Sequence, residues 1–134
     1  MSKLEKVRDY IKKCPYLVGN KIAVSYLDKG IDSYSIDEIP SNPILKEYKA
    51  GDKLLQKTFD FTVKAPFSEL ENLKNSQFCE DFSDWIVEQQ ALKILPEIEN
   101  IQKIKCITPG YVIQTNDTTA IYVIQMQIVW YKKI

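Results

Sequence analysis

Three carboxylates recur at helical spacing near the middle of the chain. Glu80, Asp84 and Glu88 follow one another at one-turn intervals, and Asp81 adjoins the first of them. Clustered carboxylates could bind a divalent metal ion or act as general acid and base. However, ligands on one outer helix face do not enclose an ion, and the segment lacks an apolar pocket that would shift a carboxyl pKa. We therefore interpret these side chains as a solvated face or part of a subunit interface.

Two other motifs resemble ligand or modification sites only superficially. The segment from Asp28 to Glu38 (DKGIDSYSIDE) looks like a calcium-binding loop but lacks the glycine required at its sixth position. Asn116, Asp117 and Thr118 match a glycosylation triplet, yet an Asn-Asp pair between two strands is typical of a tight turn. The glycines are scattered and form no phosphate-binding loop. We predict no metal site and no cofactor.

Histidine is absent from the sequence. This removes the usual general base of serine, cysteine and acetyl-transfer enzymes, so an enzyme would have to use carboxylates, lysine or tyrosine. The cysteines, Cys14, Cys79 and Cys106, contain no CxxC pair and predict neither a disulfide framework nor a zinc site. We expect buried thiols in a reducing compartment, no catalytic residues and no enzymatic activity.

Charge is balanced overall but unevenly distributed. The chain has 18 basic and 18 acidic side chains, which argues against nucleic acid as its main partner. Residues 1–65 hold 12 basic and 9 acidic side chains, residues 66–100 hold 2 and 8, and residues 101–134 hold 4 and 1. An acidic helical region and basic strand regions would suit head-to-tail association of copies. Ordinary solvation of a helix explains the same pattern.

Helices and strands must position these groups. A helix is predicted over residues 2–13, where Ser2 and Glu5 form a capping box and Pro15 ends the pattern. Residues 31–39 alternate like a strand, and residues 44–49 and 53–65 flank a turn and predict a long hairpin.

The second half of the chain continues this mixture of elements. A short helix is predicted over residues 68–74, with Ser68 and Glu71 as a second capping box, and a longer helix over residues 76–92. Residues 101–115 predict a strand broken at Pro109 and Gly110, turning into a final strand.

The final strand, residues 120–134, is apolar on both faces. The first face carries only apolar side chains, and the second is apolar apart from Gln125 and Gln127. The run is too short to span a bilayer as a helix and ends in lysines, and the N-terminus lacks a signal-peptide core. We expect no membrane anchor and no export. The predicted fold is a single α+β domain, residues 1–134, with a four- or five-stranded mainly antiparallel sheet and helices packed on one face.

Four segments together resemble a known family: KKCPYL (residues 12–17), YSIDEIPSNPILKEYKAGDKLLQKTFDFTVK (34–64), NSQFCEDFSDWIVEQQ (75–90) and the TPGY turn (108–111). The likeness covers nearly the whole chain and is to the tail terminator, or tail completion, proteins of phages and prophages of Gram-positive bacteria. Many of these carry an inherited label as chloramphenicol resistance proteins. That activity would need a histidine base, which this chain lacks.

The resemblance implies a structural virion protein that caps a finished tail tube, stops its polymerisation and forms a docking ring. Its partners would be copies of itself in a hexameric ring, the tail tube protein, and a head-tail connector or collar protein. DNA could pass through the ring without sequence-specific binding. The protein would assemble in the bacterial cytoplasm and end in the tail or neck of the particle.

Pattern alone suggests which residues would form these contacts. We expect the hairpin tip to contact the tube or lumen through Tyr48, Lys49, Asp52 and Lys53. We expect subunit contacts through Ile121, Val123, Val129, Tyr131, Glu80, Asp84 and Glu88. The alternatives are ordinary surface and ordinary packing within the domain.

Two other functions fit the same sequence. One is a neck or head-completion protein on the connector side of the same joint. The other is a small cytoplasmic ligand-binding module or a carboxylate-dependent enzyme, which would be a monomer with a polar pocket.

Overall fold

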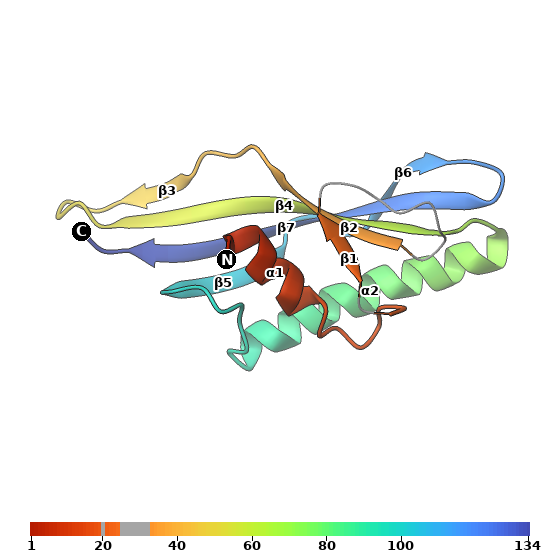
Figure 1. Cartoon of the computed structure of the whole chain (residues 1–134), viewed down its shortest axis with the longest axis horizontal. Helices are drawn as coiled ribbons and strands as arrows, with labels where there is room; N and C mark the ends of the chain where they lie inside the picture. The colour runs from red at the N-terminus through yellow and green to blue at the C-terminus, as the bar shows by residue number, and fades with distance from the viewer. Residues whose placement is uncertain (20, 25–32) are drawn as a thin grey trace.

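The structure, a computed structural model, describes residues 1–19, 21–24 and 33–134 (Figure 1). These residues form two helices and seven strands. In chain order they are α1 (Lys3–Ile11), β1 (Ile22–Val24), β2 (Ser33–Ile39), β3 (Ile44–Glu47), β4 (Lys53–Pro66), α2 (Glu69–Ala91), β5 (Ile101–Cys106), β6 (Tyr111–Thr115) and β7 (Thr119–Lys132).

The centre of the sheet is the antiparallel pair of β4 and β7. Their register runs without a break from Lys53 opposite Lys132 to Pro66 opposite Thr119. On its outer side β4 pairs with β2 along one half and with β3 along the other, while β7 pairs with β6 and β5 in the same manner. Four short strands therefore frame two long ones, and all these pairs are antiparallel. The exception is β1, which pairs with β2 in parallel.

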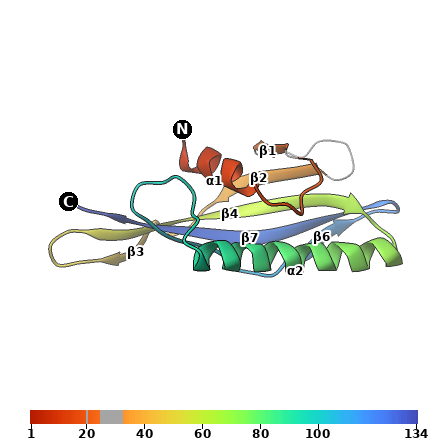
Figure 2. The ribbon, with the colours of Figure 1, turned by 90° about the horizontal axis from the view of Figure 1, so that it is seen from below.

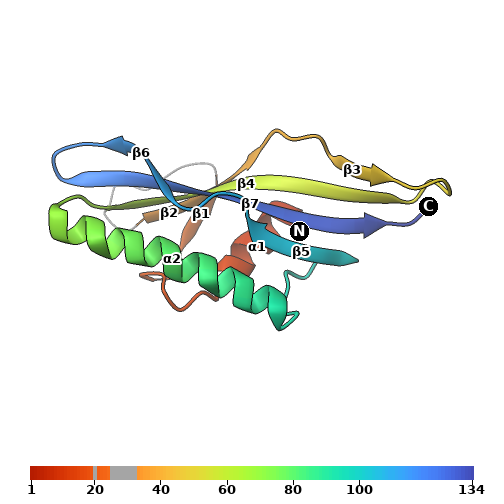
Figure 3. The same cartoon turned by 180° about the vertical axis from the view of Figure 1, so that it is seen from behind.

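Both helices pack on the same face of the sheet, side by side (Figure 2). They contact each other through Tyr10 and Trp85, whose ring centroids are 5.5 Å apart, and the Tyr10 hydroxyl donates to the Ile94 carbonyl at 2.7 Å. Among the described residues no helix lies on the opposite face of the sheet (Figures 1 and 3). We call this opposite face the uncovered face.

The core lies between the helices and the sheet. Because strand side chains alternate between faces, the helix-facing residues of β4 and β7 form one continuous apolar layer. Aromatic rings connect this layer to α2, with the Phe61 and Phe82 centroids 5.0 Å apart. The largest fully buried side chains of this core are Phe59, Phe61, Phe82, Ile11, Ile36, Ile86, Ile104, Ile124, Met126, Ile128 and Val7.

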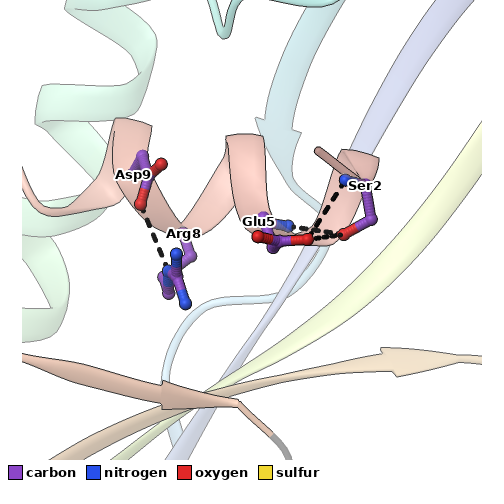
Figure 4. Close-up of polar contacts among 4 residues, drawn as sticks. All are labelled: Ser2, Glu5, Arg8 and Asp9. Atoms are coloured by element: carbon purple, nitrogen blue, oxygen red, sulfur yellow. Dashed lines mark hydrogen bonds and ion pairs between the residues drawn. The ribbon is translucent and has the colours of Figure 1, made fainter.

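The N-terminal helix begins as predicted. The Ser2 hydroxyl accepts from the Glu5 backbone N–H at 3.1 Å, and the Ser2 backbone N–H donates to the Glu5 carboxylate at 3.2 Å (Figure 4). These two bonds satisfy N–H groups that a helix start otherwise leaves unpaired. One turn later Arg8 and Asp9 form an ion pair of 3.2 Å. The predicted capping box is confirmed.

The structure confirms the α+β class but corrects two details. The sheet has seven strands in the described residues, where four or five were predicted, because the short strand β1 was not recognised and the broken segment 101–115 forms two separate strands. The two predicted helices of residues 68–92 are one helix, α2. Residues 31 and 32 of the predicted strand 31–39, and residues 28–32 of the calcium-loop-like segment, lie outside the described residues.

Helix α2 continues through the predicted break because Asn75 has tertiary partners there. Its side-chain amide donates to the Pro66 carbonyl at 2.9 Å and to the Tyr122 hydroxyl at 3.4 Å. The side chain of a free asparagine tends to hydrogen-bond nearby backbone groups and so disfavours a helix. Because the Asn75 side chain bonds to Pro66 and Tyr122 instead, Asn75 is compatible with a helix interior.

Candidate assembly surfaces

Of the predicted tube-contact residues, Tyr48, Lys49 and Asp52 lie in the turn between β3 and β4, and Lys53 is the first residue of β4; the turn is at one end of the molecule (Figure 1). The Tyr48 backbone N–H donates to the Asp52 carbonyl and the Gly51 N–H donates to the Tyr48 carbonyl, each at 2.8 Å. Gly51 has a φ of +93°, a conformation that favours glycine. We call residues 44–57, which include the two strand segments and this turn, the arm.

The tip of the arm is tied to the end of β7. The Asp52 carboxylate accepts hydrogen bonds from the Tyr131 hydroxyl and from the Ile134 backbone N–H, the latter at 3.0 Å. The bond from Tyr131 lowers the pKa of Asp52 and raises the pKa of Tyr131, because it favours the ionised carboxylate and the neutral phenol. The structure thus brings together Asp52, predicted to contact the tube, and Tyr131, predicted to contact a neighbouring copy.

The arm and the end of β7 carry an excess of positive charge. Apart from Lys57, which forms an ion pair with Glu38, the cations are Lys46, Lys49, Lys53, Lys132 and Lys133. None of them forms an ion pair with a residue that the structure describes. The Lys46 ammonium lies 5.0 Å from the centroid of the Tyr48 ring. Apolar side chains are exposed beside these charges: Ile44 at 37%, Leu45 at 44% and Tyr48 at 37%.

The predicted acidic residues lie on α2, away from the arm. Glu80, Asp84 and Glu88 are all exposed, and none has an ion-pair partner in the described part of the chain. The same helix exposes two large apolar side chains, Leu73 and Val87, each at 68%. Within the described ranges no three His, Cys, Asp or Glu side chains are grouped so that they could hold a metal ion.

The remaining predicted interface residues lie on the uncovered face of β7. Val123 and Val129 are only 3% and 1% exposed, so each has little surface left for a neighbouring copy. Val123 is opposite Thr62 and Tyr111, its direct neighbours in the ladders to β4 and β6. Ile121 and Tyr131 are partly exposed and could make such contacts.

The uncovered face also holds a pair of like charges. Asp37 on β2 is directly opposite Asp60 on β4. Burial raises the pKa of Asp60, a hydrogen bond from Gln125 partly offsets the rise, and the Asp37 charge adds to it. One Asp60 oxygen is buried and has no hydrogen-bond partner among the described residues. The ionised form of Asp60 is therefore unfavourable in the folded chain.

We predict that Asp60→Asn stabilises the protein near pH 7 by about 0.5–1 kcal/mol, the scale of a repulsive cross-strand pair. The pKa of Asp60 is higher in the folded chain than in the unfolded chain. The ionised Asp60 carboxylate therefore destabilises the folded chain by its full amount at pH values above the folded-state pKa. The effect disappears as the pH falls below the unfolded pKa. Urea unfolding at pH 7 and pH 3 should show a gain only at pH 7. Asp117→Asn, in an exposed turn, is the control; a loss of stability at pH 7 for Asp60→Asn would contradict this prediction.

The sequence did not reveal a groove between α2 and β6. It has a volume of about 450 Å³ and is lined on one side by α2 and on the other by residues 109–112, with Tyr122 between them. Glu80 and Asp84 are on the α2 side, and Tyr111 and Val112, 42% and 46% exposed, are on the β6 side. The one signal in the sequence was the apolar run of residues 111–113 after the TPGY turn.

A second cavity of about 310 Å³ lies at the same end of α2. Its walls include the aromatic side chains of Tyr34, Phe78 and Tyr122, together with Asn75. Such a composition is compatible with an apolar ligand. The amide of Asn75 is already engaged by Pro66 and Tyr122, so it has a structural role in holding α2 to the sheet.

All three cysteines are free thiols. Burial raises the pKa of Cys14 and Cys79, and it raises that of Cys106 to about 11. Thiols with raised pKa values are poor nucleophiles and poor metal ligands near neutral pH. Across the described residues neither helix has the length and apolar character that crossing a bilayer requires.

Comparisons with known proteins leave the function open. No protein-family model and no curated protein matches the chain. One solved structure, whose name describes no function, aligns over 97% of this chain and 92% of its own, with 13% identity and a TM-score of 0.46. A likeness this distant supports no inference about function.

Proposed function

We propose that this protein is a tail terminator of a phage or a phage-tail-like particle. In this role copies of the chain form a ring on the end of a finished tail tube, stop its growth and offer a docking surface to a head connector or collar. The proposal begins from the resemblance of residues 12–17, 34–64, 75–90 and 108–111 to that family. It is supported by the surfaces that the fold leaves open.

The observation that carries the proposal is the arm. Every residue from 41 to 50 is exposed, and this end of the sheet extends past both helices (Figure 2). Within the described sheet β3 pairs only with β4, so its other edge has no strand partner and is open to another chain. A projection of this kind, with unpaired cations and exposed apolar side chains, is suited to contact with another protein.

The mechanism would be geometric and would need no bond-making chemistry. One side of the ring would bind the last ring of the tube, and the other side would present a different surface. A further tube subunit could not bind to that second surface, so the tube would stop growing. The helix layer on one face of the sheet and the uncovered opposite face give each copy two unlike sides (Figure 2). Unlike sides are what a heterologous, ring-forming contact requires.

Loss of the gene tests this function directly. Particles from a deletion mutant should have overlong tails, because nothing stops tube polymerisation, and electron micrographs would measure the tail lengths. A complementing wild-type copy should restore the normal length. Tails of normal length that are not attached to heads would instead support the neck or head-completion role, and normal particles would contradict both.

A further inference from the structure

The arm and the groove between α2 and β6 carry complementary surfaces. The arm offers unpaired lysines beside Tyr48 and Leu45, whereas the groove offers the unpaired carboxylates Glu80 and Asp84 beside Tyr111 and Val112. Opposite charges that border apolar surface on both partners favour a specific encounter.

The charge difference extends beyond these few residues. Helix α2 has six acidic side chains and one basic side chain, Lys74. The arm tip and the end of β7, residues 46–53 and 132–133, have five basic and two acidic side chains. The Lys74 ammonium lies 3.5 Å from the Glu71 carboxylate on the same helix. The one cation of α2 is therefore paired with Glu71 and not with Glu80 or Asp84.

These two surfaces cannot meet within one chain. The tip of the arm is at one end of the long axis, and β6 is at the other end (Figures 1 and 3). A contact between them must therefore join two copies. Unless two copies make it reciprocally in a two-fold dimer, the contact is heterologous and leaves a free arm and a free groove for further copies. Repeated contacts of this kind close into a ring when the rotation between copies allows it.

We propose that the arm of one copy docks in the α2–β6 groove of the next copy, with Lys49 and Lys53 near Glu80 and Asp84 and with Tyr48 against Tyr111 and Val112. This inference rests on the proposed assembly into a ring and identifies the surfaces that form it. The groove volume of about 450 Å³ suits a few tip side chains and not a whole strand pair. The partner is therefore the turn of the arm.

Charge reversal on each surface tests the contact. The arm variant carries Lys49→Glu and Lys53→Glu, and the groove variant carries Glu80→Lys and Asp84→Lys. Each variant alone places like charges opposite each other, so assembly should weaken at least tenfold in concentration. The readout is mass by light scattering, or protein that sediments with tail tubes if the wild type assembles only on tubes.

Combining the reversals provides the specific control. A chain that carries both sets has opposite charges at the contact again and should assemble within about threefold of the wild type. An equimolar mixture of the two single-surface variants should also assemble, because each arm then finds a groove of opposite charge. Lys13→Glu with Lys93→Glu changes the net charge by the same amount as the arm variant, on exposed positions elsewhere, and should leave assembly unchanged. Urea midpoints would verify that all variants fold.

Failure of this inference differs from failure of the proposed function. If the wild type assembles and the arm and groove variants assemble equally well, the proposed contact is wrong and the ring is formed by other surfaces. Weakened single-surface variants that neither the combined chain nor the mixture restores would also overturn the contact. If the wild type neither assembles nor binds tail tubes, the proposed function itself is contradicted.

Discussion

Phe82→Ala should cost the protein ~3–5 kcal/mol of its free energy of unfolding, the usual cost of deleting a buried phenylalanine ring. Phe82 is 0% exposed and contacts three other rings, with centroid distances of 5.0 Å to Phe61 and 6.1 Å to Phe78 and Trp85. Its ring connects α2 to the centre of the sheet. Because domains are stable by only about 5–15 kcal/mol, this loss removes a large share of the total.

Urea unfolding followed by circular dichroism would measure the loss. Val87→Ala on the same helix is the matched control, because Val87 is 68% exposed and its truncation should change stability by at most ~0.5 kcal/mol. If Phe82→Ala is unfolded under native conditions, Phe82→Leu gives a measurable intermediate loss. A cost below ~1 kcal/mol for Phe82→Ala would mean that α2 is not packed on the sheet as described.

Gly110→Ala should destabilise the protein by ~1–3 kcal/mol, the typical cost of forcing extra atoms into a packed site. A Cβ atom at position 110 would lie 2.3 Å from the Cys79 sulfur and 2.9 Å from the Cys79 Cβ. The Cys79 Cβ is attached to the backbone of α2, so rotation of the side chain cannot relieve the contact. The connection between β5 and β6 would have to move away from the helix.

A double-mutant cycle with Cys79→Ala isolates this contact. Removing the sulfur leaves only the 2.9 Å contact, so Gly110→Ala should cost less in the Cys79→Ala background than in the wild type. The Ile124 Cγ1 atom, at 3.3 Å, is expected to adjust. Equal costs in both backgrounds would show that the loss has another origin, such as altered backbone freedom.

Local sequence patterns were sufficient to predict most of the fold. The alternation in residues 53–65 and 120–134 predicted the two long strands and the helix-facing residues Phe59, Phe61, Ile124 and Met126, all of which are fully buried. Side-chain direction in a strand depends only on position parity, so such predictions need no tertiary information. The capping box of Ser2 and Glu5 is equally local.

Features that depend on distant residues were missed. The single helix α2 depends on bonds from Asn75 to Pro66 and Tyr122, which sequence spacing cannot indicate. The parallel strand β1 has only three residues, Ile22–Val24, too few for a periodic signal.

For the candidate surfaces, too, features that depend on local sequence could be predicted and contacts between distant residues could not. The exposure of Glu80, Asp84, Lys46 and Lys49 agrees with their polar patterns. Val123 and Val129, in contrast, were expected at an interface and are buried within the chain. The link from Asp52 to Tyr131 and the groove beside β6 join segments far apart in sequence. Neither could be inferred before the strands were placed in order.

The central claim is that this chain acts as a shaped surface for copies of itself and for a tail tube. The most direct test is the mass of the purified protein in solution, measured by light scattering over a range of concentrations, alone and with tail tubes. We predict a closed assembly of about six copies, or a monomer that forms such a ring on the tube end. A protein that stays monomeric at high concentration and does not bind the tubes would contradict the claim.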